Sequence, residues 1–347
     1  MKLYCDYNAT TPMRKEVFNA VVDAMKRFWG NSFSPHSLGR ESGIAVENAR
    51  EKVAKLVSCP ARSVRFTSGA TESNSWLLSH YQRREKRIMV SAVEHPSVLQ
   101  YGDCQLSTDE NGVIRLELLE RELNTGTVGI VSVMAANNET GVIQPIQEIF
   151  QCCQRYGVPF HCDASQIYSK ISMPVAADFI TLSAHKFGGP KGVGALVLNR
   201  EIDALLQGGP QERGSRAGTH NIPAIVGMGV AASLCETPYR FDTLPLEKQI
   251  CKLGGRVLGS NVNRLPNTVS ALFSTPGDLV VFALDLRGVQ ASTGSACSSG
   301  ASQDSHVLRA MGEAGTPVRF SLGPDTDIVT LCDILEDVLT SMEAECV

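Results

Sequence analysis

The sequence has no apolar run long enough to cross a membrane and no marked excess of one charge. Its longest apolar stretches, 130–136 and 226–234, fall well short of the roughly 20 residues that a membrane-spanning helix needs. Lys and Arg number 32 against 36 Asp and Glu, a net charge of -4 that gives no strong attraction to nucleic acid or anionic lipid. We therefore expect a soluble protein that contacts neither nucleic acid nor a membrane directly.

The 11 cysteines include no C-x-x-C pair, which argues against a structural zinc site and a thioredoxin-like site. Their odd number leaves at least one unpaired, so reduced thiols in the cytosol are the simpler interpretation. Residues 1–6 lack the basic region and long apolar stretch of a secretory signal. We expect a cytoplasmic protein that binds no metal.

Alternating strand and helix patterns dominate residues 60–200. The 347 residues, 43% hydrophobic and 20% charged, suit a globular protein of about two domains. Strands are predicted at 64–67, 87–91, 128–134, 158–162, 179–182 and 194–198, with helices or turns starting near 71, 145 and 165. This pattern predicts a parallel sheet covered by helices, with the ligand beyond the carboxyl ends of the strands.

The pattern changes after residue 238. Helices are predicted at 246–258, 278–287, 305–311 and 325–342, strands at 268–273 and 318–321, and a Ser/Gly-rich segment at about 291–305. We expect a large domain at 12–240 and a smaller α/β domain formed by 1–11 and 241–347.

Residues 66–73 lead from a strand into a helix, with a glycine at the turn and hydroxyl side chains at the helix start. Backbone N–H groups and the positive end of the helix dipole favour a phosphate there. An ordinary helix N-cap is the alternative interpretation.

Two chemically distinctive residues follow neighbouring strands. Asp163 ends one apolar strand, and Lys186 follows the next strand 23 residues later. A lysine can form a Schiff base with pyridoxal phosphate, and an aspartate can keep the pyridine nitrogen protonated. Lys170 and Lys191 compete for the lysine role, but neither directly follows an apolar strand. A helix cap and a solvated lysine are the alternatives for Asp163 and Lys186 taken singly.

Cys297 lies among small, mostly polar residues in the Ser/Gly-rich segment. Such a segment packs poorly, so it is either a connector with an incidental thiol or an arm that brings a reactive thiol to a buried cofactor.

Together these motifs resemble the group I cysteine desulfurases, a branch of the class V aminotransferases with the fold of fold-type I pyridoxal-phosphate enzymes. The resemblance covers nearly the whole chain through the motifs at 6–12, 67–73, 94–95, 137–141, 163–166, 185–186, 211–219, 295–297 and 319–323. It implies a large domain with a mostly parallel central sheet flanked by helices, and a smaller α/β domain.

The resemblance also implies residue roles. Lys186 would carry the cofactor, Asp163 would pair with its pyridine nitrogen, and His95 would stack on its ring and move protons. Gln166 and Asn138 would bind the ring hydroxyl. The phosphate would be bound by Ala70, Thr71, Ser183 and His185, and by Thr219 from the other subunit of a homodimer. The substrate pocket would be lined by Arg319, Asn8 and Asn138. Arg319 would clamp the substrate carboxylate.

The implied reaction removes sulfur from L-cysteine, leaving alanine and a persulfide on Cys297 that passes to a sulfur-acceptor protein. Only a thiolate attacks, so we hypothesise that His95 takes the proton of Cys297. Alternatives are a selenocysteine lyase, a class V aminotransferase or an inactive desulfurase-like binding subunit. Iron-sulfur assembly, tRNA thiolation, a sulfur carrier and DNA phosphorothioation all remain open as pathways.

Two segments depart from the family pattern. The stretch 238–266 and the link from the 305–311 helix to Arg319 are shorter than usual, which implies a trimmed small domain. The chain also ends at Val347 without the longer tail by which some members dock an iron-sulfur scaffold.

Overall fold

The computed structural model describes residues 2–294 and 305–345. Its centre is a seven-stranded sheet of order β2-β8-β7-β6-β5-β3-β4. The strands are β2 (Val64–Thr67), β3 (Arg87–Ser91), β4 (Cys104–Leu106), β5 (Val128–Met134), β6 (Phe160–Asp163), β7 (Phe179–Ser183) and β8 (Gly194–Leu198). β8 runs opposite to the other six strands, which all run in one direction, so the predicted mostly parallel sheet is confirmed.

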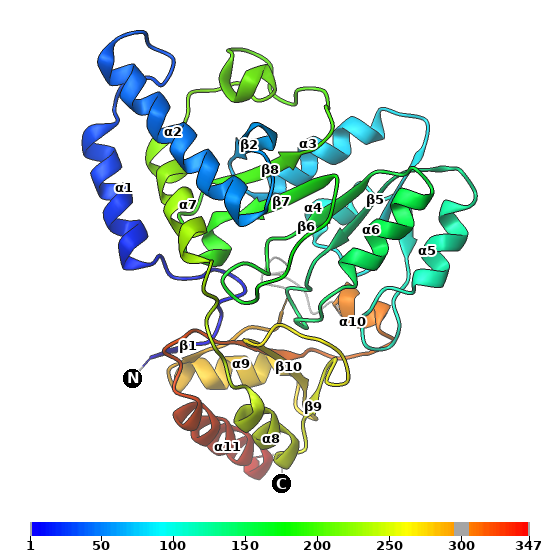
Figure 1. Ribbon diagram of the computed structural model, residues 1–347. Helices are drawn as coiled ribbons and strands as arrows, with labels where there is room; N and C mark the ends of the chain where they lie inside the picture. The colour runs from blue at the N-terminus through cyan, green and yellow to red at the C-terminus, as the bar shows by residue number, and fades with distance from the viewer. Residues whose placement is uncertain (1, 295–304, 346–347) are drawn as a thin grey trace.

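Helices cover this sheet because its strands are apolar on both faces and need shielding from water on both sides. They are α1 (Lys15–Arg27), α2 (Ser37–Leu56), α3 (Ala70–Gln82), α4 (Pro96–Leu99), α5 (Leu116–Leu123), α6 (Ile146–Arg155) and α7 (Ile222–Leu234). The nearly all-apolar α7 packs against α1 and α2, whereas α5 and α6 lie at the other side of the sheet (Figure 1). Short 3-10 helices lie at Ala61–Ser63 (η1), Ala184–Phe187 (η2) and Gln211–Gly214 (η3).

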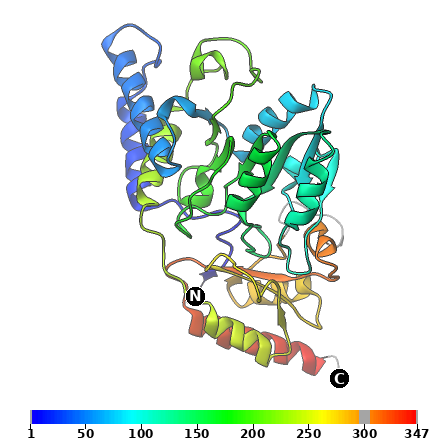
Figure 2. The ribbon, with the colours of Figure 1, turned by 45° about the vertical axis from the view of Figure 1, so that its right-hand side comes forward.

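A second body lies below the large sheet in both ribbon views (Figures 1 and 2). It contains the three-stranded sheet β12-β10-β9 and the pair β1-β11. Its elements are β1 (Leu3–Tyr4), α8 (Leu244–Lys252), β9 (Arg256–Val257), β10 (Thr268–Leu272), α9 (Gly277–Leu286), β11 (Val289–Gln290), α10 (His306–Ala310), β12 (Val318–Ser321) and α11 (Ile328–Glu345). Leu3 and Cys5 join the apolar cluster of this body, which ties the start of the chain to its last third. The predicted domain boundaries remain a prediction.

Two predicted helix boundaries are wrong. The helix expected over 246–258 ends at Lys252, because Gly254 turns into the left-handed region with φ 75° and the chain then enters β9. The last helix begins at Ile328 rather than 325, because the Asp327 side chain accepts hydrogen bonds from the N–H groups of Val329 and Thr330 and so caps it. Within the described residues, no helix is long and apolar enough to span a membrane.

Candidate active site

A cleft of about 780 Å³ opens at the carboxyl ends of β5, β6 and β7 and extends to the lower body. The last residues of these three strands, Met134, Asp163 and Ser183, all line it. Eleven of the predicted site residues line this one cleft: Asn8, Ala70, Thr71, His95, Asn138, Asp163, Gln166, Ser183, His185, Lys186 and Arg319. They converge because parallel strands end at one edge of the sheet and the lower body closes over that edge.

Two predicted site residues are not among those that the structure places in the cleft. Thr219 is exposed and does not line the cleft of its own chain. Cys297 belongs to 295–304, outside the described residues.

The phosphate cradle is the start of α3. The first N–H groups of a helix have no acceptor within the helix, and the N-cap Gly69 has no side chain to supply one. Glu72 in the first turn accepts hydrogen bonds from Ser68 N at 2.8 Å and from Arg216 Nε at 2.8 Å. Burial works against ionisation of this carboxyl, but these bonds outweigh it and lower the pKa of Glu72. Since Arg216 balances the Glu72 charge, the N-terminal end of α3 still suits an anion.

Asp163 is buried and accepts two hydrogen bonds, from Ser165 N to Oδ1 at 3.0 Å and from Asn74 Nδ2 to Oδ2 at 2.9 Å. Asn74 Nδ2 also donates to Ser97 Oγ at 3.0 Å. The sequence analysis missed Asn74, although it follows Thr71 by three residues and so shares a helix face with it. Asn74 thereby holds the Asp163 carboxylate in a fixed orientation and links it to the His95 side of the cleft.

His95 caps α4. Its Nδ1 accepts a hydrogen bond from Ser97 N at 3.1 Å and lies 2.9 Å from Ser97 Oγ. Burial lowers the pKa of His95, so the ring is neutral at neutral pH. A backbone N–H can only donate, so the neutral ring carries its proton on Nε2.

Lys186 lies on η2, directly after β7, and its Nζ donates to the backbone oxygen of Asn8 at 2.6 Å. Its neighbour His185 approaches Thr10 Oγ1 through Nδ1 at 3.1 Å. Burial, with the nearby charges of Lys186 and Lys191, lowers the pKa of His185 to about 4. His185 is therefore a neutral hydrogen-bonding group beside Lys186.

Arg319 comes from β12 and is buried. Its Nη1 donates to the backbone oxygens of Asn138 (2.7 Å) and Gly294 (3.0 Å), and Nη2 donates to Asp6 Oδ1 (2.5 Å). Nε is buried and has no hydrogen-bond partner within the described parts of the chain. Because Arg319 also lines the cleft, its positive charge lies where a substrate carboxylate could pair with it.

Two buried acids near the cleft, Glu94 and Glu139, lie in the motifs at 94–95 and 137–141, but the sequence analysis assigned neither a role. Glu94 accepts from Ser91 Oγ at 2.5 Å and from Met134 N at 2.7 Å, and burial raises its pKa to about 8. Burial also raises the pKa of Glu139, which accepts from Ser305 Oγ at 2.6 Å. Their motifs do not reveal that these two carboxyl groups are buried.

His306 and Arg309 of α10 also line the cleft. They are three residues apart in a predicted helix, a spacing that places both on one face. That spacing is the signal that could have identified them.

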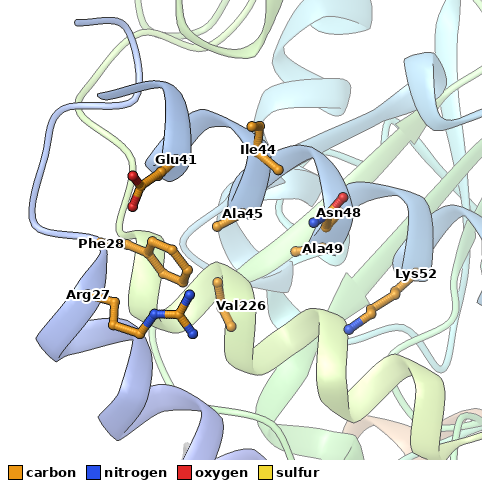
Figure 3. A pocket seen from close by; sticks show the side chains of 9 residues that line it. All are labelled: Arg27, Phe28, Glu41, Ile44, Ala45, Asn48, Ala49, Lys52 and Val226. Atoms are coloured by element: carbon orange, nitrogen blue, oxygen red, sulfur yellow. The ribbon is translucent and has the colours of Figure 1, made fainter. Parts of the chain in front are cut away.

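A second hollow, of about 370 Å³, lies between α1, α2 and α7 (Figure 3). Phe28, Ile44 and Val226 give it an apolar wall, and it shares no lining residue with the cleft. Its chemistry suits packing rather than catalysis, so the cleft is the candidate active site.

Comparison with known proteins identifies the family. Residues 3–329 match the family model described as aminotransferase class-V. Cysteine desulfurase IscS of Dictyoglomus turgidum is 38% identical, with 98% of this chain and 95% of that protein aligned.

Solved structures agree with this match. A NifS-like protein superposes with a TM-score of 0.88 at 30% identity, covering 99% of this chain and 100% of that one. SspA, solved in complex with cysteine, gives a TM-score of 0.83 at 30% identity over 93% of this chain and 99% of its own. The chain belongs to the class-V aminotransferase family, within its cysteine desulfurase branch.

Proposed function

We propose that this chain is a pyridoxal-phosphate-dependent cysteine desulfurase that takes sulfur from L-cysteine, releases alanine and carries the sulfur as a persulfide on Cys297. One observation carries the proposal. A single cleft holds a lysine at a strand end, a buried aspartate, an anion-binding helix start and a buried arginine. The family match, with cysteine desulfurases among its relatives, supports the same reaction.

The residues present suit the cofactor. The start of α3 offers N–H groups to a phosphate, and a Cβ on Gly194 would lie 2.7 Å from Gly69 Cα, so the backbone is closely packed behind the cradle. The phosphate would be bound by Ala70, Thr71, Ser183 and His185. Asp163 would bind the pyridine nitrogen, and Gln166 and Asn138 would lie on the ring-hydroxyl side. His95 would contact the ring face, and Lys186 would bond to the aldehyde carbon. Bound in this way, pyridoxal phosphate withdraws electrons from the amino acid's α-carbon.

Arg319 positions the substrate. Backbone oxygens and Asp6 hold the guanidinium still through Nη1 and Nη2, and its positive charge at the cleft wall would pair with the substrate carboxylate. Asn8 lines the same cleft, with its side-chain Nδ2 donating to Thr268 Oγ1 at 3.0 Å. The carboxylate is thereby anchored on the lower-body side of Lys186.

Proton movement falls to Lys186 and His95. The Lys186 amine, which Asn8 O holds in place, would remove the α-proton of the substrate. His95 carries its proton on Nε2, so in this state it gives a proton more readily than it takes one. The hypothesis that His95 takes the Cys297 proton therefore requires the ring to shift its proton to Nδ1, toward Ser97 Oγ. A His95→Ala variant that forms persulfide at the parental rate would remove His95 from this step.

The first experiment is to supply the protein with pyridoxal phosphate, L-cysteine and a reductant and to quantify alanine and sulfide. We expect the parent to form alanine and sulfide in equal amounts, and Cys251→Ser, a matched control at an exposed cysteine, to do the same. Cys297→Ser should form neither product. Alanine that persists without Cys297 would favour a lyase or aminotransferase. No turnover in the parent would favour an inactive binding subunit.

We further propose a homodimer in the cytoplasm that delivers sulfur to an acceptor protein. Support comes from large apolar side chains on and beside α1 and α2 that stay exposed, including Phe18 (56%), Met25 (65%) and Trp29 (72%). Phe18 and Met25 lie on α1, which borders the apolar hollow, and Trp29 follows the end of this helix. The exposed Thr219 would then complete the phosphate site of the second subunit.

Subunit mixing tests this arrangement. Lys186→Ala and Thr219→Ala are each expected to impair the site, and mixed dimers should regain activity because one of their two sites has both residues. Without recovery in proven mixed dimers, Thr219 does not act across the interface.

A further inference from the structure

Lys170 is a buried lysine behind the cleft that the proposed reaction does not use. It is 4% exposed and ends a run of turns that starts at Ser165. Ser169, immediately before it, has φ 67°, a left-handed conformation that costs free energy in a residue other than glycine. The backbone thus accepts strain where it turns the lysine inward.

Among the described residues, the hydrogen bonds of the Lys170 ammonium go to two amide oxygens. Nζ donates to Gln166 Oε1 at 2.5 Å and to Asn8 Oδ1 at 2.8 Å. No carboxylate in the described residues forms an ion pair with it. Burial, with the charges of Lys186 and Arg319, lowers the pKa of Lys170 well below its usual value. A buried lysine without a counter-ion is costly, whereas an apolar side chain at this position would avoid that cost.

These two bonds determine how both amides are oriented. A lysine ammonium has donors and no acceptor, so each amide must turn its oxygen toward it. The opposite ends of the amides then point elsewhere: Gln166 Nε2 donates to Asn8 O at 3.0 Å, and Asn8 Nδ2 donates to Thr268 Oγ1 at 3.0 Å.

Both oriented residues line the cleft, and they connect Lys170 to the reactive lysine. Asn8 O, which accepts from Gln166 Nε2, also accepts from Lys186 Nζ at 2.6 Å. The proposed contact of Gln166 with a ring hydroxyl requires the N–H₂ end of the amide, because a deprotonated hydroxyl can only accept. Lys170 itself does not line the cleft.

We propose that Lys170 is a positioning residue that, by holding the oxygens of Gln166 and Asn8, presents the N–H₂ group of Gln166 to the cofactor and keeps the Asn8 backbone oxygen in place for Lys186. This inference rests on the proposed function, since it assumes that the cleft binds pyridoxal phosphate. Positioning of these two amides would explain why a lysine is buried here, although its burial is unfavourable for stability.

Lys170→Met tests the inference, because methionine has similar length and no N–H donors. The readouts are the dissociation constant of pyridoxal phosphate and the pH midpoint of the visible band of the loaded protein. The substitution removes the fixed orientation of the Gln166 donor and any positive charge on Lys170. Both changes favour the protonated form of the bound cofactor, so the pH midpoint of its visible band should rise. Cofactor affinity should fall about tenfold, the size expected for one hydrogen bond to a charged group.

Two further variants separate positioning from packing. In a Gln166→Met background, Lys170→Met should move the midpoint by less than a third of its effect in the parent, since it acts through Gln166. Lys170→Gln should shift the midpoint in the same direction, because its amide does not enforce one orientation, and it decides the matter if the methionine variant fails to fold. Lys248→Met, at an exposed position, is the matched control and should change neither readout.

The outcomes are distinct. A parent that forms no visible band with pyridoxal phosphate removes the proposed function and this inference with it. A normal parent band with an unshifted midpoint in the folded Lys170 variants overturns the inference alone. Equal shifts with and without Gln166 also overturn it.

Discussion

We expect replacement of the Glu212 carboxylate by an amide to lower the free energy of unfolding strongly. Its carboxylate accepts from Arg50 Nη1 (2.7 Å) and Nη2 (2.9 Å), from Phe66 N (2.7 Å), and lies 2.8 Å from His220 Nε2. It therefore ties η3 to α2 and to β2. Glu212 and Arg213 have left-handed φ values of 49° and 61°, so these contacts also hold a strained turn in place.

The magnitude follows from the pKa. Although burial opposes it, hydrogen bonding to His220 and Arg50 lowers the pKa of Glu212 from 4.5 to about 2. At about 1.4 kcal/mol per pKa unit, this is worth roughly 3 kcal/mol. Removing one partner of a buried ion pair costs a similar amount, about 3–5 kcal/mol. Because the pKa is lowered on folding, the contribution is fully present above pH 4.5 and is lost as the pH falls from there toward 2.

We expect Glu212→Gln to lower the melting temperature at pH 7 by about 4 °C, which is roughly 3 kcal/mol for a chain of this size. Glu236→Gln is the matched control, since Glu236 pairs with Lys55 on the surface and should contribute less than about 1 kcal/mol. Thermal melts followed by circular dichroism at pH 7 and pH 3.5 measure both. The reasoning fails if the two variants melt alike at pH 7, or if the gap between Glu212→Gln and the parent does not narrow at pH 3.5.

Two further predictions concern the cleft. Arg319→Lys keeps the charge but loses the planar fork, so the KM for L-cysteine should rise about 10- to 100-fold while kcat changes less; an unchanged KM in steady-state kinetics, with a melt showing a folded variant, would place the substrate carboxylate elsewhere. The pKa of Glu94 is about 8 in the folded chain and 4.5 in the unfolded chain. Between these pH values Glu94 ionises only in the unfolded chain, so the free energy of unfolding of the parent falls as the pH rises. Glu94→Gln should lose less stability between pH 5 and pH 9 than the parent, and parallel melting curves would contradict the assignment.

Most of the candidate site was visible in the sequence because of how parallel sheets end. Asp163 and Lys186 follow apolar runs long enough to predict β6 and β7, and neighbouring parallel strands must bring their carboxyl ends to one edge. The cradle at Thr71 was visible for a similar reason, since a glycine and hydroxyl residues at a strand-to-helix turn are a local signal. The class of protein was therefore predictable before any distance was known.

Residues that act through long-range contacts gave no such signal. Lys170 was identified only as a competitor of Lys186, Glu94 was named only as part of the motif at 94–95, and Asn74 was not singled out. Their behaviour depends on burial and on partners distant in sequence, such as Asn8 for Lys170 (2.8 Å) and Asp163 for Asn74 (2.9 Å). The end of α8 is a different case, because its signal is local: two consecutive glycines, Gly254 and Gly255, outweigh the apolar periodicity that predicted a longer helix.

The sequence by itself determined the order of strands and helices, the reactive side chains at the strand ends and the family, because these follow from local patterns of apolar residues and short motifs. The tertiary structure decided which groups face one another, which are buried and how their protons are placed. Arg319 shows the difference: its identity is a matter of sequence, but its burial and its bonds to Asp6 and two backbone oxygens arise only in the folded chain. Solvent exclusion and hydrogen-bond partners are properties of the folded chain, so only the folded chain reveals them.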